Sequence, residues 1–217
     1  MPSFVDMSKG IAFVHIPKTG GIAISSAIES NSITRCCIER YQKKDKDLES
    51  DFDVIHATAN MMHIKSVKKI IAVVRNPYDR FVSMFCMGVT LGMHTFEPTK
   101  EGSMEFCEYF NINPECQDLL LFKPQTHFTH TQTSHGLQPI ANMMFRFEDF
   151  ENTLRECCRC FDVPLEEIDM KICNANLYEC REKYSLWYEN NYELTRFVNE
   201  VYKSDFDMFE YKMNDGS

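Results

Sequence analysis

The sequence lacks an apolar run long enough to cross a membrane, and its first residues lack the basic and apolar pattern of a signal peptide. From these two absences we expect a cytoplasmic protein without a membrane span. The chain also contains no internal repeat and no low-complexity segment. Its length therefore favours a single domain over residues 1–217.

Basic residues are in deficit, with 23 Lys and Arg against 32 Asp and Glu and a net charge of −9. Because proteins that bind a phosphate backbone need a basic face, this balance argues against nucleic acid as a partner. A local basic pocket for a small anion is still compatible with it. The apolar content of 44% and charged content of 25% are typical of a globular protein.

Cysteine, in contrast, is abundant, with ten residues in the chain. Cys157 and Cys160 form a C-x-x-C pair, a spacing that zinc and redox sites use. No second pair stands at a zinc-ribbon spacing, because Cys173 and Cys180 are seven residues apart. The residues around the pair have the apolar periodicity of a helix. We therefore interpret these cysteines as buried, reduced thiols and expect no metal site.

Short apolar runs alternate with helical patterns along the chain. We expect strands at 11–16, 52–56, 68–75 and 143–147, and helices at 22–28, 77–86, 103–110, 151–161 and 183–203. The run from Lys68 to Arg75 is the clearest strand, since its continuous β-branched character suits a buried parallel strand. The alternation predicts an α/β fold of three layers, with helices on both faces of a central parallel sheet.

The most informative segment is Ile11-Ala-Phe-Val-His-Ile-Pro-Lys-Thr-Gly-Gly21, an expected strand followed by a turn of small residues and then a helix. This arrangement directs backbone N–H groups and a helix N-terminus at an anion. The two glycines allow a close approach of the backbone, and Lys18 adds a positive charge. We expect the ligand to be a phosphate or a chemical relative of phosphate. The alternative is an ordinary exposed turn.

A second candidate anion site follows the clearest strand. Arg75 ends that strand, and Ser83 lies eight residues later in the following helix. Open α/β sheets bind ligands at the carboxyl ends of their strands, where an arginine and a hydroxyl can hold one phosphate together. The alternative is an arginine in a surface salt bridge beside an ordinary helical serine. Two such elements suit one ligand with two separated anionic groups.

Two stretches, His15-Ile-Pro-Lys-Thr-Gly-Gly21 and Val73-Val-Arg-Asn-Pro-Tyr-Asp-Arg-Phe-Val-Ser83, resemble the cofactor motifs of sulfotransferases. Within these enzymes they resemble the carbohydrate-type branch, to which the heparan sulfate 2-O- and 6-O-sulfotransferases belong. Phe122-Lys-Pro-Gln-Thr126 and Phe145-Arg-Phe-Glu-Asp-Phe150 look like two further stretches of that branch. The resemblance spans roughly residues 10–210 and implies a P-loop-NTPase-like sulfotransferase fold.

The resemblance implies metal-independent transfer of a sulfuryl group from 3′-phosphoadenosine-5′-phosphosulfate (PAPS) to a hydroxyl of a small-molecule or glycan acceptor. Lys18 would neutralise charge on the bridging oxygen, and Arg75 and Ser83 would bind the 3′-phosphate. Four backbone N–H groups would hold the 5′-phosphate, those of Thr19, Gly20, Gly21 and Ile22. Related loops continue with Thr and a small hydroxyl residue where this chain has Ile22 and Ala23, so two side-chain donors are missing.

The resemblance also suggests a catalytic base. His56 begins the stretch His-Ala-Thr-Ala-Asn60, which is similar to the position of a catalytic histidine in related sugar sulfotransferases. A histidine titrates near neutrality and can accept the proton of the acceptor hydroxyl. His63 is the alternative base. We further expect His63, Gln125 and His127 to contact the acceptor.

Two other functions stay open. The first is a P-loop kinase for a small molecule, although Lys18 precedes the glycines instead of following them and Arg75 stands where a magnesium-binding carboxylate is needed. The second is a non-catalytic protein of the same fold that binds 3′-phosphoadenosine 5′-phosphate (PAP). The replacement of hydroxyl residues by Ile22 and Ala23 motivates this second reading.

Overall fold

The computed structural model describes residues 3–30, 38–40, 58–62, 67–164 and 184–214. The chain forms two compact units, Met1–Val74 with His127–Ala175 and Arg75–Thr126 with Asn176–Ser217. The strand expected at 52–56 lies outside the described residues. The assignment of the whole chain to a single domain stays a prediction.

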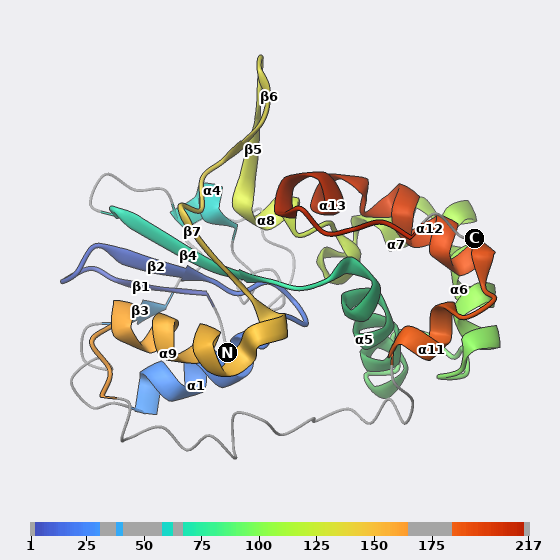
Figure 1. Cartoon of the computed structure of the whole chain (residues 1–217), viewed down its shortest axis with the longest axis horizontal. Helices are drawn as coiled ribbons and strands as arrows, with labels where there is room; N and C mark the ends of the chain where they lie inside the picture. Colours follow the sequence, from blue (N-terminus) through green and yellow to red (C-terminus); the bar gives the residue numbers. More distant parts are fainter. Residues whose placement is uncertain (1–2, 31–37, 41–57, 63–66, 165–183, 215–217) are drawn as a thin grey trace. The chain divides into compact units, whose positions relative to one another are not determined.

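The first unit is built on a five-stranded sheet with the order β3-β1-β2-β4-β7 (Figure 1). The strands are β1 (Phe4–Asp6), β2 (Ile11–Val14), β3 (Ile38–Arg40), β4 (Lys69–Val74) and β7 (Met143–Arg146). β4 is parallel to both of its neighbours, β2 and β7, whereas β1 is antiparallel to β2 and to β3. The predicted α/β fold with a central parallel sheet is confirmed in the strands β2, β4 and β7, and the antiparallel edge of β1 and β3 was not predicted.

Strand β4 is apolar from Ile70 to Val74, and both of its faces are covered there. Ile71 and Val73 belong to the buried cluster on one face, and each is at most 1% exposed. Since side chains alternate along a strand, Ile70, Ala72 and Val74 point to the opposite face, where they are also buried. Burial on both faces therefore explains the continuous hydrophobic run from which the sequence predicted a buried parallel strand.

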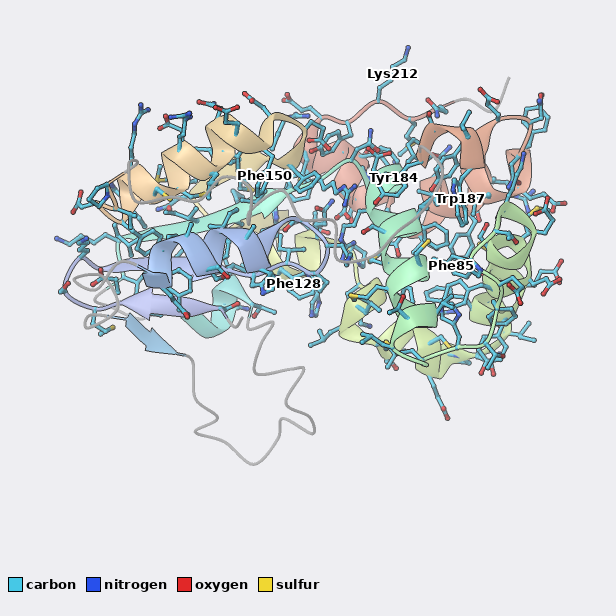
Figure 2. The ribbon with its side chains drawn as sticks, turned by 90° about the horizontal axis from the view of Figure 1, so that it is seen from below. Phe85, Phe128, Phe150, Tyr184, Trp187 and Lys212 are labelled. Atoms are coloured by element: carbon cyan, nitrogen blue, oxygen red, sulfur yellow. The ribbon has the colours of Figure 1, made fainter. Side chains whose placement is uncertain are left out.

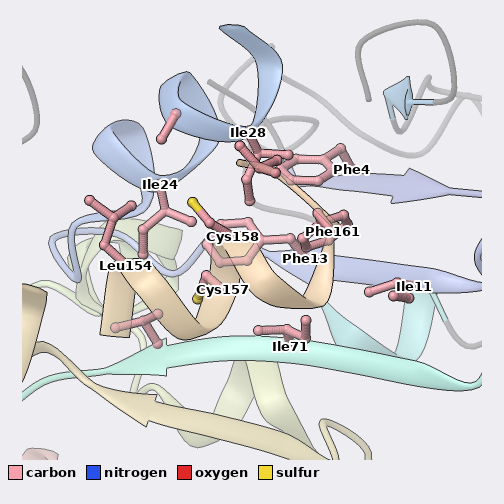
Figure 3. Close-up of a cluster of buried hydrophobic side chains, with 13 residues drawn as sticks. Phe4, Ile11, Phe13, Ile24, Ile28, Ile71, Leu154, Cys157, Cys158 and Phe161 are labelled. Carbon is pink, nitrogen blue, oxygen red and sulfur yellow. The ribbon is translucent and has the colours of Figure 1, made fainter. Parts of the chain in front are cut away.

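Helices α1 (Gly21–Ser30) and α9 (Phe150–Cys160) pack on the face of Ile71 and Val73 (Figure 3). Their contribution to this core includes Ile24, Ile28, Leu154, Cys157 and Cys158. Cys157 and Cys160 are reduced, and burial raises the pKa of both thiols. The interpretation of this pair as helical, reduced thiols is confirmed, although Cys160 is only partly buried.

The remaining described elements of the sheet unit are short. They are α4 (Ala59–Met62), α8 (Thr126–Thr129), the antiparallel hairpin of β5 (His130–Thr133) and β6 (Gly136–Pro139), and the 3-10 helix η2 (Phe147–Asp149). The hairpin projects from the sheet as a separate two-stranded ribbon (Figure 1).

The second unit is helical in its described part. Its elements are α5 (Pro77–Thr90), α6 (Lys100–Ile112), α7 (Pro114–Asp118), the 3-10 helix η1 (Leu120–Phe122), α11 (Tyr184–Tyr188), α12 (Tyr192–Val201) and α13 (Lys203–Phe209). Helix α5 begins as predicted, with Pro77 in its first turn and the Asn76 side chain accepting a hydrogen bond from the N–H of Tyr78. The single helix expected at 183–203 is wrong. Asn190 has a φ of 52°, and the Asn191 side chain caps a new helix, α12.

Aromatic rings form the core of this helical unit. Phe106 contacts Phe81, Phe85, Phe110 and Phe122, and Phe85 also meets Trp187 edge to face (Figure 2). His94 stacks on Phe85 with ring centroids 4.9 Å apart. Burial lowers the pKa of His94, because the charged imidazolium would lose its hydration there.

Cys86, on α5, is disulfide-bonded. The sequence interpretation of reduced thiols concerned the pair Cys157 and Cys160 and does not extend to Cys86.

His94 should make the unfolding free energy depend on pH. Its pKa in the folded state lies below that of the unfolded chain, so the unfolded state binds the proton first, and stability is lost as the pH falls below about 6.5. We expect His94→Phe, which keeps a ring and removes the titrating group, to weaken this loss. Urea unfolding at about pH 7.5 and about pH 5 measures it.

His130, whose pKa is also lowered by burial, should sustain the rest of the pH dependence. The exposed His135 in the turn of the hairpin supplies the control variant His135→Gln, which should keep the wild-type slope. An unchanged slope in His94→Phe would contradict this account.

Candidate functional site

The turn between β2 and α1 has an unusual backbone. Lys18 and Gly20 have φ angles of 69° and 80°, in the left-handed region, and Thr19 between them does not. A left-handed conformation costs a lysine on the order of 1–2 kcal/mol and costs a glycine nothing comparable. Alternating backbone conformations of this kind turn successive N–H groups toward one side, which suits an anion. The anion loop predicted from the sequence therefore has a suitable backbone.

Two hydroxyl groups stabilise this loop from within. The hydroxyl of Thr19, a residue that is 1% exposed, donates to the carbonyl of Ile16 over 3.0 Å. The hydroxyl of the buried Ser25 donates to the carbonyl of Gly21 over 2.7 Å. These side chains hold the loop and the first turn of α1 in place. Because both hydroxyls already donate to carbonyls of the loop, the loop would bind a ligand through its backbone N–H groups.

The start of α1 offers a positive helix end. The first N–H groups of an α-helix have no acceptor within the helix, and α1 carries no acidic residue in its first turn. Ile22 in this turn is 44% exposed, and Lys18 is partly exposed. The backbone here can therefore take a phosphate or sulfate, while Ile22 offers no polar side-chain atom.

Both glycines of the loop lie against rings, so neither has room for a side chain. A Cβ on Gly20 would lie 2.5 Å from Cε2 of Phe150 and 3.0 Å from Cε2 of Phe147. A Cβ on Gly21 would lie 2.1 Å from Cδ2 of His15, which is 4% exposed. His15 is thus part of the packing beneath the loop. The two phenylalanines follow β7 and were not predicted to contact the loop.

Arg75 directly follows β4 and belongs to the helical unit. It is 7% exposed, and its guanidinium carbon lies 4.9 Å from the centroid of the Tyr184 ring. The N–H of Arg75 donates to Oε1 of Gln125 over 2.8 Å, and Nε2 of Gln125 donates to the carbonyl of Arg75 over 2.8 Å. Ser83 lies in α5 of the same unit and is also 7% exposed. Arg75 is therefore a buried cation with a fixed backbone.

A buried carboxylate supports Gln125. Asp205 of α13 is 0% exposed and accepts hydrogen bonds from the backbone N–H groups of Gln125 and Thr126. Burial raises the pKa of Asp205, and the nearby charge of Arg80 and these N–H donors oppose the shift. Burial also lowers the pKa of Arg80, which is 0% exposed and donates to the carbonyls of Leu121 and Lys123.

The structure distributes the predicted site residues between the two units. Lys18, Thr19, Gly20, Gly21 and Ile22 form the loop and helix start of the first unit, and Arg75, Ser83 and Gln125 belong to the second. His127 is exposed and lies within the short helix α8. His56 and His63 lie outside the described residues. The sequence interpretation did not identify the contacts of Phe147, Phe150, Tyr184 and Asp205, which join residues far apart in the chain.

Residues 1–212 match the model of the sulfotransferase family. The chain therefore belongs to the sulfotransferase family, whose members are transferases that move sulfuryl groups. Comparisons with curated proteins and with solved structures found no match. In the part of the chain that the structure describes, no helix is long and apolar enough to cross a membrane. The same part has no group of three or more His, Cys, Asp or Glu side chains that could hold a metal ion.

Gly20 should tolerate alanine less well than two other glycines of positive φ. Gly92 and Gly136, with φ of 67° and 95°, have no atom within 4 Å of an added Cβ, whereas Gly20 would meet two phenylalanine rings. All three alanine variants share the left-handed cost of about 1–2 kcal/mol, and Gly20→Ala adds an overpacking cost of about 1–3 kcal/mol. Denaturant unfolding of the three variants measures the difference, and equal destabilisation would show that the rings do not confine the loop.

Proposed function

We propose that this chain transfers the sulfuryl group of PAPS to a hydroxyl of a carbohydrate or another small hydroxylated acceptor, as in the carbohydrate-type branch. The observation that carries the proposal is the succession of two candidate anion elements at neighbouring strand ends. The glycine loop follows β2 and Arg75 follows β4, and these strands are parallel neighbours. Parallel neighbours present their carboxyl ends at one edge of a sheet, where such folds bind ligands.

The residues present suit the two ends of this nucleotide. The loop has no space for side chains at Gly20 and Gly21, so its backbone N–H groups and those of α1 would hold the 5′-phosphate. Arg75, with Ser83 from α5, would hold the 3′-phosphate. PAPS supplies an activated sulfuryl group when it is bound. Lys18 would stabilise the negative charge that develops on the leaving phosphate oxygen.

His56 is the proposed general base, and His63 is the alternative. This assignment rests on the place of His56 in the sequence and on the need for a group that accepts the proton of the acceptor hydroxyl. The exposed His127 suits a contact with the acceptor. We assign no acceptor role to Gln125, because its amide is buried and hydrogen-bonded to the backbone of Arg75.

A non-catalytic protein that binds PAP is the second candidate function. It is favoured by Ile22, which presents an exposed apolar side chain at the start of α1 where a hydroxyl could contact a phosphosulfate. The backbone donors of the loop remain, so nucleotide binding is expected under either function. Turnover separates the two.

The disulfide bond at Cys86 is relevant to the cellular compartment in which the protein resides. Disulfide bonds persist in oxidising compartments and are rare in the cytoplasm. We therefore propose an oxidising compartment for this protein, in place of the cytoplasm expected from the sequence. Alkylation of free thiols in the protein isolated without reductant, followed by mass spectrometry, would show whether Cys86 is oxidised.

PAP should raise the melting temperature of the protein without any metal. A ligand at about 100 times its dissociation constant adds about 2.7 kcal/mol to the unfolding free energy. We expect this rise in the presence of EDTA, and we expect Arg75→Ala to remove most of it. Arg155→Ala is the control, because Arg155 is an exposed arginine of α9 that pairs with Glu151. Stabilisation by ATP with Mg²⁺ and not by PAP would instead support a kinase.

Turnover with PAPS and a panel of hydroxylated acceptors tests catalysis itself. His56→Ala should retain PAP binding and lose sulfuryl transfer. Binding of PAP by the wild-type protein without turnover on any acceptor would favour the non-catalytic function.

A further inference from the structure

The side-chain amide of Gln125 pairs with the backbone of Arg75 directly after β4. A glutamine side chain carries an NH₂ donor and a carbonyl acceptor, so it can pair with both the N–H and the C=O of a peptide backbone. In this structure it pairs with both backbone groups of Arg75, each over 2.8 Å. For one residue, the side chain of Gln125 thus makes the two hydrogen bonds that a neighbouring strand would make.

The orientation of this amide is itself fixed. Nε2 of Gln125 donates to Arg75 and, over 3.3 Å, to Oδ2 of Asp205, while Oε1 accepts from Arg75. A rotated amide would set its oxygen against two acceptors and its nitrogen against an N–H donor. Asp205 also accepts from the backbone N–H groups of Gln125 and Thr126, over 2.8 and 2.9 Å. The carboxylate therefore holds both the segment and the side chain.

Burying a carboxylate costs free energy unless hydrogen bonds and charges compensate for its lost hydration. Asp205, Gln125 and Arg80 are all 0% exposed. An apolar core could stabilise the helices of this unit equally well, so stability alone does not account for this polar network. Its direct effect is on Arg75, whose backbone it fixes and whose guanidinium stacks on Tyr184.

We propose that Gln125 and Asp205 are positioning residues that fix Arg75 for the 3′-phosphate of the nucleotide, and so give the protein its preference for 3′-phosphorylated nucleotides. This inference rests on the proposed function. A cation that is already oriented loses little conformational freedom on binding, so the 3′-phosphate gains affinity from it. Once the hydrogen bonds from Gln125 and Asp205 are lost, the Arg75 side chain can reach other rotamers, and the gain in affinity for the 3′-phosphate diminishes.

The test compares binding of PAP with binding of AMP, which has the 5′-phosphate and lacks the 3′-phosphate. Calorimetric titration of each protein gives the ratio of the two dissociation constants. Gln125→Met keeps the approximate volume and removes the amide, and we expect it to lower the preference for PAP about tenfold with AMP binding preserved, the scale of one charge-assisted hydrogen bond. Arg75→Ala should lower the preference at least as far.

Two further variants make the test specific. Gln117→Ala is the matched control, because Gln117 lies in the same unit and donates to the backbone of Phe110. It should keep the wild-type ratio. Asp205→Asn keeps the shape of the side chain and replaces one acceptor oxygen by an NH₂ group, so a smaller loss of preference is expected. It carries the test if Gln125→Met does not fold.

The outcomes separate this inference from the proposed function. If Arg75→Ala lowers the preference for PAP and Gln125→Met and Asp205→Asn do not, the positioning role is overturned and the nucleotide site stands. If the Gln125 and Asp205 variants weaken PAP and AMP binding equally, their role is structural and the inference is also overturned. If Arg75→Ala leaves the preference unchanged, the assignment of the 3′-phosphate to Arg75 fails, and with it part of the proposed function.

Discussion

Parallel pairing of β2, β4 and β7 is the constraint on which the candidate site depends. In this register Val14 of β2 lies opposite Ala72, and Val74 of β4 lies opposite Arg146. The strands β2, β4 and β7 therefore end at the same edge of the sheet, and the glycine loop and the segment with Phe147 follow β2 and β7 there. Within this arrangement Ile71 and Val73 of β4 pack into the core of α1 and α9.

The candidate anion loop at this edge offers backbone donors, and this determines which of its side chains matter. Gly20 and Gly21 are needed because rings lie where their Cβ atoms would be. The hydroxyls of Thr19 and Ser25 stabilise the loop through its own carbonyls. Because N–H groups do not change with the side chain, a loop with Ile22 at the start of the helix keeps these donors. Catalysis is more sensitive, since it depends on charge stabilisation at the reacting atoms.

Local patterns predicted the parts of the fold that depend on neighbouring residues. The apolar run of β4, the start of α5 at Pro77 and the glycine turn are each encoded within a few residues, and all were predicted. The antiparallel edge was not, because β1 and β3 are three residues each and have no detectable pattern. The pairs Arg75–Gln125 and Gln125–Asp205 are 50 and 80 residues apart in the chain, beyond the reach of any local periodicity.

The segment Phe122-Lys-Pro-Gln-Thr126 shows how a weak sequence resemblance can acquire a physical meaning. A backbone that leaves the end of a strand loses its ladder partners, and buried peptide groups without partners are costly. Arg75 is in this position and is 7% exposed, so it needs both a donor and an acceptor from elsewhere. One glutamine side chain supplies both, and a buried aspartate prevents it from rotating. The hydrogen bonds that satisfy the backbone of Arg75 at the end of β4 thus also fix the position from which its side chain extends.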